Sequence, residues 1–144
     1  MLVFDVHGYS GSAYDQMAIK WGSTWALTGM KNNFLVLWPD GMGDNPWGVK
    51  SWDVSSTVGP KGRTCPVDRY WPYFSCPYSC SSCDVSTSCE WNTCHDDIGF
   101  IEFAQQEVTN KWCVDLDQMH LSGFSNGGMM SYYVASFGTD ALGM

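Results

Sequence analysis

The residues from Gly123 to Gly127 read Gly-Phe-Ser-Asn-Gly, a pattern in which one serine stands between two glycines. The segment follows a short β-forming stretch and precedes a run with helical periodicity, which is the context of a nucleophilic serine. In such a sharp turn the hydroxyl of Ser125 projects, and side chains at 123 and 127 would collide with the neighbouring strand and helix. The backbone N–H of Asn126 would point toward a developing oxyanion. The pattern predicts Ser125 as the nucleophile of acyl transfer, and the alternative is an ordinary glycine-rich turn.

A second turn, His7-Gly8-Tyr9-Ser10-Gly11, follows the apolar stretch at the start of the chain. In α/β-hydrolases one donor to the oxyanion comes from a loop after an early central strand. The backbone N–H of Tyr9 is the expected donor, with His7 and Gly8 supporting the loop, so the side chain of Tyr9 is not required. Taken alone, the segment favours a glycine turn beside a core histidine. Its pairing with the serine turn favours the oxyanion loop.

The elements that must position these turns alternate along the chain. Three β-forming stretches predict strands, at residues 2–6, 34–38 and 118–122. Three runs with helical spacing predict helices, at residues 13–22 (or as far as 28), 96–111 and 129–137. Ser12 is the expected N-cap of the first helix and Gly29 its end, and Asp96 or Asp97 caps the second. Strands that alternate with helices predict an α/β fold with a parallel sheet and helices on its faces.

Each predicted helix has one apolar face that we expect to be buried. In the first helix this face consists of Tyr14, Met17, Ala18, Trp21 and Trp25. In the second it consists of Ile98, Ile101, Gln105, Val108 and Trp112, widened by Phe100 and Ala104. In the third it consists of Met129, Met130, Tyr133, Val134 and Phe137.

Six of the seven cysteines lie between residues 65 and 94, in a segment without sustained periodicity. Such density predicts disulfides in an oxidising, extracellular setting, and we expect residues 60–94 to form a disulfide-stapled loop insertion. The alternative is a structural zinc site, disfavoured because no second Cys-x2-Cys pair follows. Trp52 and Trp71 are candidates for substrate contact, and burial is the alternative for the aromatic residues of this loop. The disulfide candidates are Cys65, Cys76, Cys80, Cys83, Cys89, Cys94 and Cys113, with their pairing left open.

The chain has 144 residues and a formal net charge of −8, with 7 Lys+Arg against 15 Asp+Glu. This length predicts a single domain over 1–144. The acidic balance argues against nucleic acid as a partner, because phosphate binding needs Lys and Arg, and against anionic membrane surfaces. No apolar run approaches the roughly 20 residues of a membrane span. The start of the chain lacks the features of a signal peptide, and we expect neither a metal nor a cofactor.

Several short strings occur in the order found in a known esterase group, namely His7-Gly8, Trp38-Pro39-Asp40-Gly41, Ser51-Trp52-Asp53, Asp96 to Ile101, Cys113-Val114-Asp115 and Ser122 to Met130. Over nearly all of its length the chain resembles the poly(3-hydroxybutyrate) depolymerase and feruloyl esterase family of α/β-hydrolases, and the Cys-rich segment departs from it. The resemblance implies a three-layer fold with a mostly parallel central sheet, and an acyl-Ser125 intermediate. It also implies an ester substrate, either feruloyl or acetyl esters of polysaccharides or polyhydroxyalkanoate-type polyesters.

In α/β-hydrolases the catalytic residues follow the chain order serine, acid, histidine. Only 19 residues follow Ser125, and they contain Asp140 but no histidine. We therefore expect a fragment, a partial α/β-hydrolase domain that hydrolyses esters poorly in isolation. The alternative is a catalytically inactive pseudoenzyme, or a Cys-rich binding module.

Overall fold

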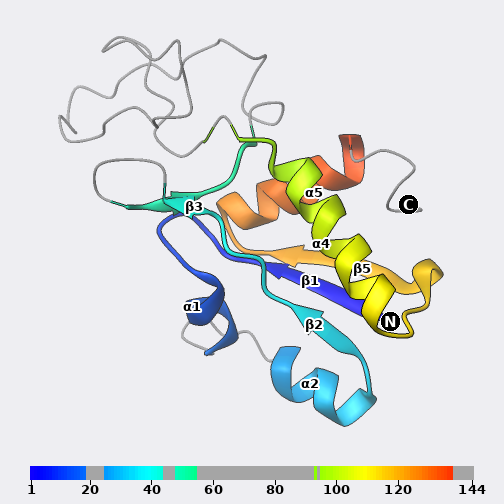
Figure 1. Ribbon diagram of the computed structural model, residues 1–144. Helices are drawn as coiled ribbons and strands as arrows, with labels where there is room; N and C mark the ends of the chain where they lie inside the picture. Colours follow the sequence, from blue (N-terminus) through cyan, green and yellow to red (C-terminus); the bar gives the residue numbers. More distant parts are fainter. Residues whose placement is uncertain (19–24, 44–47, 55–92, 94, 138–144) are drawn as a thin grey trace, which may run out of the picture.

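The computed structural model describes residues 1–18, 25–43, 48–54, 93 and 95–137 (Figure 1). They form a mixed α/β arrangement around a three-stranded parallel sheet. In chain order the elements are β1 (Leu2–Val6), α1 (Ala13–Met17), α2 (Trp25–Asn32), β2 (Leu35–Leu37), β3 (Met42–Gly43), β4 (Lys50–Ser51), α4 (Asp97–Lys111), a 3-10 turn (Leu116–Gln118), β5 (Met119–Gly123) and α5 (Asn126–Phe137).

Strand β1 lies in the middle of the sheet, between β2 and β5. It pairs with β5 along its whole length, from Leu2 opposite Met119 to Val6 opposite Gly123. Parallel strands need long crossover connections, and helices supply them here. Because β1 and β5 end at the same register position, the turns that follow them lie next to each other.

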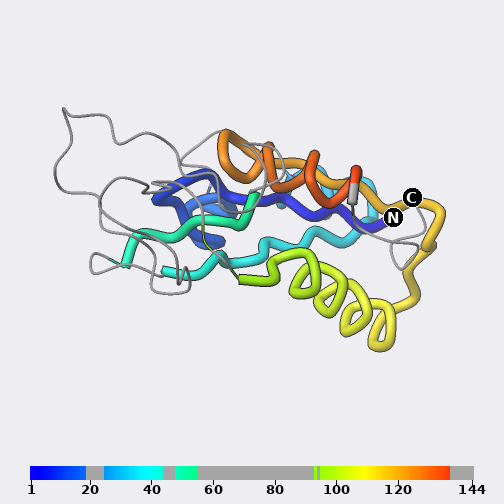
Figure 2. The backbone as a smooth tube through the Cα atoms, turned by 90° about the horizontal axis from the view of Figure 1, so that it is seen from above, coloured from blue at the N-terminus to red at the C-terminus, as the bar shows by residue number. Residues whose placement is uncertain are grey.

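Every residue of β1 is buried, as expected for an apolar central strand of a parallel sheet. Its alternate residues Leu2, Phe4 and Val6 belong to the main apolar cluster. The buried members of that cluster from the helices are Ile101 and Val108 of α4, and Met130 and Val134 of α5. The side chain of Asp5 points to the opposite face of the sheet, where the side-chain amide of Gln16 in α1 donates to its carboxylate at 3.0 Å. Helices therefore lie on both faces of the sheet (Figures 1 and 2).

The first predicted helix is wrong in its extent. Its region contains the short α1 and the separate α2, with Trp21 between them outside the described residues. Ser12 caps α1 as expected, because its side chain accepts from the backbone N–H of Asp15 at 3.1 Å. Gly29 does not end the helix but lies inside α2, where the carbonyl oxygen of Phe34 comes within 2.9 Å of the position that a Cβ would take.

The expected buried face of that helix is also wrong. Tyr14 and Met17 are 65% and 42% exposed, whereas Gln16 is buried. The reason lies on the neighbouring strand. The buried carboxylate of Asp5 needs hydrogen-bond donors, so α1 turns an amide rather than an aromatic ring toward the sheet.

Helix α4 agrees with the helix predicted at 96–111. Asp96 is its N-cap, with a carboxylate that accepts from the backbone N–H of Gly99 at 2.9 Å, while Asp97 is buried beside it. The buried members of its expected stripe are Ile101, Gln105 and Val108. The outer members differ, since Phe100 and Trp112 are 40% and 54% exposed.

The remaining elements differ from expectation by a few residues. Strand β5 is shifted by one residue, and α5 begins three residues earlier than predicted, at Asn126. Strand β2 falls within the predicted strand 34–38, but Leu35 is partly exposed. Between β2 and α4, where no regular element was predicted, β3 and β4 form a short antiparallel pair with Met42 opposite Ser51.

The predicted α/β class with a parallel sheet is confirmed at this coarse level. Apart from Thr93, the insertion predicted at 60–94 lies outside the described residues, and so do six of the disulfide candidates. Cys113 is described, and its thiol is free and exposed rather than paired. Among the helices that the structure describes, none has the length and hydropathy to cross a membrane.

Candidate active site

Ser125 stands in the turn between β5 and α5, and it is exposed. Its φ of 53° lies in the left-handed region, which costs a non-glycine residue on the order of 1–3 kcal/mol and persists only where the surroundings impose it. Two backbone hydrogen bonds impose it here, from Gly127 to Phe124 at 2.9 Å and from Met129 to the carbonyl of Ser125 at 3.0 Å. Residues 123–127 are called the Ser125 turn below.

Glycines on either side allow this turn to pack tightly. A Cβ on Gly123 would overlap the main chain of Gly127, and a Cβ on Gly127 would overlap the carbonyl oxygens of Val6 and His7. All of these are backbone atoms of packed segments, so they cannot rotate aside as a side chain would. The collisions predicted from the glycine spacing are confirmed at both positions.

Residues 7–11, called the His7 loop, lie directly beside the Ser125 turn. The backbone N–H of Phe124 donates to the carbonyl of Val6 at 3.3 Å and so extends the pairing of β1 with β5. A Cβ on Gly8 would be 3.4 Å from the Cβ of Ser125. The structure therefore brings Gly8 and Ser125 together, and Tyr9 follows in the same loop with its side chain half-buried.

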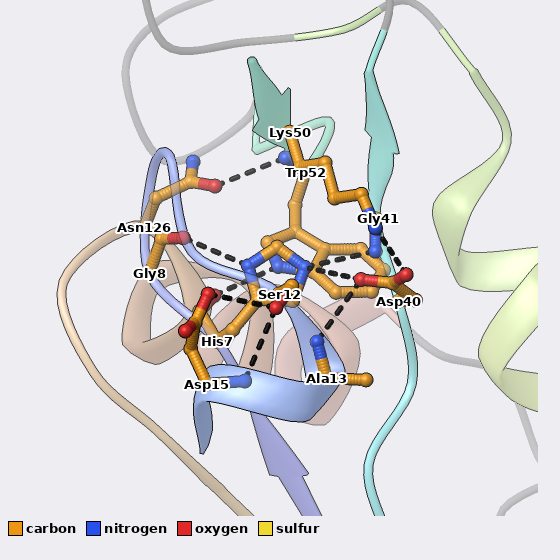
Figure 3. Close-up of polar contacts among 10 residues, drawn as sticks. All are labelled: His7, Gly8, Ser12, Ala13, Asp15, Asp40, Gly41, Lys50, Trp52 and Asn126. Atoms are coloured by element: carbon orange, nitrogen blue, oxygen red, sulfur yellow. Dashed lines mark hydrogen bonds and ion pairs between the residues drawn. The ribbon is translucent and has the colours of Figure 1, made fainter. Parts of the chain in front are cut away.

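The ring of His7 is buried, and both of its nitrogens are engaged (Figure 3). Nδ1 donates to the carbonyl of Gly8 at 2.8 Å, and Nε2 accepts from the backbone N–H of Gly41 at 2.9 Å. These contacts fit the neutral ring with its proton on Nδ1. Burial lowers the pKa of His7, against the opposing effect of Asp40, whose carboxylate lies 3.6 Å from Nε2 and also pairs with Lys50. His7 therefore supports its loop and is not placed as a base.

Trp52 joins the His7 loop and the Ser125 turn through two hydrogen bonds. Its backbone N–H donates to the side-chain carbonyl of Asn126 at 2.9 Å, and its indole N–H donates to the carbonyl of His7 at 2.9 Å. The indole also packs against the imidazole, with ring centroids 4.9 Å apart. Trp52 and Asn126 are both fully buried. Trp52 is thus a core residue, which corrects its assignment as a substrate contact. Trp71, the other candidate, lies outside the described residues.

Asp97 fastens the segment after Trp52 to α4. Its carboxylate accepts from the backbone N–H of Asp53 at 2.6 Å and from the hydroxyl of Thr93 at 3.1 Å. Burial raises the pKa of Asp97, although both hydrogen bonds oppose the shift. A brace on a loop is one of the two roles that the sequence suggests for Asp97. The Trp52 bridge was missed, because nothing local in the sequence indicates which distant groups this side chain meets.

The neutral state of His7 leads to a pH-dependent prediction. Its folded pKa is below the unfolded value of 6.5, so the stability that the ring contributes is complete above that pH and is lost as the pH falls. The charged groups around the ring are Asp40, Lys50 and Asp15. We expect the free energy of unfolding of the wild type to fall more steeply below about pH 6.5 than that of the non-titrating variant His7→Gln. Urea unfolding across this range tests it, and parallel pH profiles would contradict the assignment.

The other two histidines stand apart from this arrangement. His120 is exposed on β5, opposite Val3 and five residues before Ser125, a strand distance of about 16 Å. His95 lies just before α4, two residues ahead of Asp97. Within the described ranges, no group of three or more His, Cys, Asp or Glu side chains is arranged to hold a metal ion. No family model, curated protein or solved structure matches this chain.

Proposed function

We propose that the chain carries the nucleophile of a serine carboxylic-ester hydrolase, and that Ser125 forms its acyl intermediate. The observation that carries the proposal is an exposed serine held at a φ of 53° between two glycines that tolerate no side chain. A turn that served only to connect a strand to a helix would be more stable with glycine at this position. Keeping a hydroxyl there at a cost in stability supports a chemical role for it.

The two adjacent turns also provide groups for the steps of acyl transfer. The oxygen of Ser125 would form a bond to the ester carbonyl carbon, and the alcohol would leave with the proton that the serine gives up through a base. Water would then cleave the acyl-Ser125 ester and release the acid. The backbone N–H groups of Tyr9 and Asn126, from the two adjacent turns, are the proposed donors to the oxyanion.

The resemblance noted in the sequence extends the proposal to the fold and the substrate. We infer a partial α/β-hydrolase domain with three layers and a disulfide-stapled loop, from an extracellular enzyme. Its substrates would be feruloyl or acetyl esters of polysaccharides, or polyhydroxyalkanoate-type polyesters. The order β2-β1-β5, with the nucleophile after a strand next to the central one, is compatible with such a fold.

The hydroxyl of Ser125 makes no hydrogen bond within the part of the chain that the structure describes. A general base in contact with the hydroxyl is what activates a serine, so we expect slow acylation by this chain. Added imidazole should accelerate it, because it can take the serine proton from solution.

The experiment treats the purified chain with a fluorophosphonate probe, with and without imidazole, and follows the adduct by intact mass and peptide mapping. One adduct on Ser125, faster with imidazole, is expected. Ser125→Ala should abolish it, whereas Ser136→Ala, which removes an exposed serine of α5, should leave it unchanged. Labelling that survives Ser125→Ala, or wild-type chain that stays unlabelled with imidazole, would overturn the proposal and favour a binding module.

A further inference from the structure

The proposed oxyanion donors belong to two separate segments, and their relative position has to be fixed. Tyr9 follows β1, while Asn126 begins α5 after β5. A direct backbone link between the segments is the hydrogen bond from the N–H of Phe124 to the carbonyl of Val6, which at 3.3 Å is long. Oxyanion donors act only when they lie about 2.7–3.1 Å from the reacting oxygen, so a second link between the segments would matter.

Trp52 supplies such a link through two hydrogen bonds that point in different directions. Its backbone N–H holds the side chain of Asn126, and its indole N–H holds the carbonyl of His7, each at 2.9 Å (Figure 3). Trp52 and Asn126 are fully buried and His7 is 1% exposed, so neither bond competes with water. The His7 loop is therefore held by the indole of Trp52, and the Ser125 turn is held by the backbone of the same residue.

The bond to the His7 carbonyl acts on the peptide that leads into the proposed donor. Fixing the direction of this carbonyl fixes the plane of the peptide between His7 and Gly8, and with it the start of the turn that carries the N–H of Tyr9. A Cβ on Gly127 would overlap this same carbonyl oxygen. Its direction therefore also decides how closely the Ser125 turn can approach.

From this geometry we propose that Trp52 is a positioning residue for the proposed reaction, which sets the distance between the His7 loop and the Ser125 turn. The inference rests on the proposed function, because the two N–H groups are oxyanion donors only if Ser125 is acylated. Trp52 makes no contact with substrate, and it acts through His7 and Asn126.

The test compares Trp52→Phe with Trp38→Phe. Phenylalanine keeps an aromatic ring but removes the indole N–H. In Trp38 that group donates to Asp5 at 3.1 Å, so the control loses a bond of the same type on a part of β1 that precedes the His7 loop. With imidazole present, the maximal rate and the half-saturating concentration of fluorophosphonate labelling are measured separately, each per folded molecule.

Trp52→Phe is expected to lower the maximal labelling rate about tenfold or more with little change in half-saturation, because a displaced donor weakens the transition state rather than binding. Trp38→Phe should stay within about twofold. Should Trp52→Phe fail to fold, Asn126→Ala removes the other bond of Trp52 and keeps the backbone N–H at 126, so it should show the same loss. Equal rates in the Trp52 and Trp38 variants would overturn the positioning role alone, whereas an unlabelled wild type would overturn the proposed function itself.

Discussion

Gly127→Ala is expected to destabilise the protein by at least about 3 kcal/mol, which is a large part of the stability of a small domain. The added methyl group would overlap the carbonyl oxygens of Val6 and His7. Val6 is the last residue of the central strand and His7 the first of the loop after it, so relief requires that α5 move away from the sheet or that β1 separate from β5. Either movement also breaks the packing of Met130 in the apolar cluster.

Gly128→Ala is the matched control, one residue further along the same helix. There the nearest atom to an added Cβ is the carbonyl oxygen of Gly123, at 3.2 Å, which asks for only a small shift. Alanine also favours the helix by up to about 1 kcal/mol, so the net change should stay within about 1 kcal/mol. Urea unfolding followed by circular dichroism compares the two variants. If they unfold at the same urea concentration, the close approach of the Ser125 turn to β1 is not a constraint on stability.

Trp52→Ala is expected to cost about 3–5 kcal/mol of stability, as for a large side chain removed from a packed core. The indole is fully buried and packs against the imidazole of His7 and the ring of Phe100, which is stacked on it at a centroid distance of 6.4 Å. The substitution would also leave the buried carbonyl of His7 without its indole donor. The result expected of a substrate contact is the opposite, namely weaker substrate binding with stability unchanged.

Trp112→Ala provides the comparison, because this tryptophan is 54% exposed at the end of α4. Its loss should cost less than about 1 kcal/mol. The free energy of unfolding of both variants is measured in urea at neutral pH. A Trp52 variant as stable as the Trp112 variant would mean that Trp52 is not part of the core.

The features that sequence reasoning obtained depend on residues close together in the chain. The Ser125 turn is defined by five consecutive positions, and its glycines collide with the main chain as their spacing predicted. The N-caps Ser12 and Asp96 bond to N–H groups three residues away. Strand β1 needed only its own run of apolar residues. In each case the interactions that determine the local structure join residues a few positions apart, so the local sequence is enough to predict it.

The features that it missed depend on partners far apart in the chain. Trp52 meets His7 across 45 residues and Asn126 across 74. Gln16 is buried because Asp5 needs a donor, a fact that only the packing of α1 on β1 reveals. Hydrophobic periodicity predicts that a tyrosine rather than a glutamine is buried. It takes no account of a buried carboxylate on the neighbouring strand that needs a hydrogen-bond donor.

The pairing of β1 with β5 has a consequence for how this protein is made. During synthesis Leu2 of β1 leaves the ribosome more than a hundred residues before Met119, its partner on β5. Until then one edge of an entirely buried strand has no neighbour, and such edges recruit other chains. The loop that must close is long and the contact is non-local, which slows folding. Nascent chains should therefore depend on chaperones until β5 has been synthesised. The Ser125 turn, which follows β5, can form only after that point.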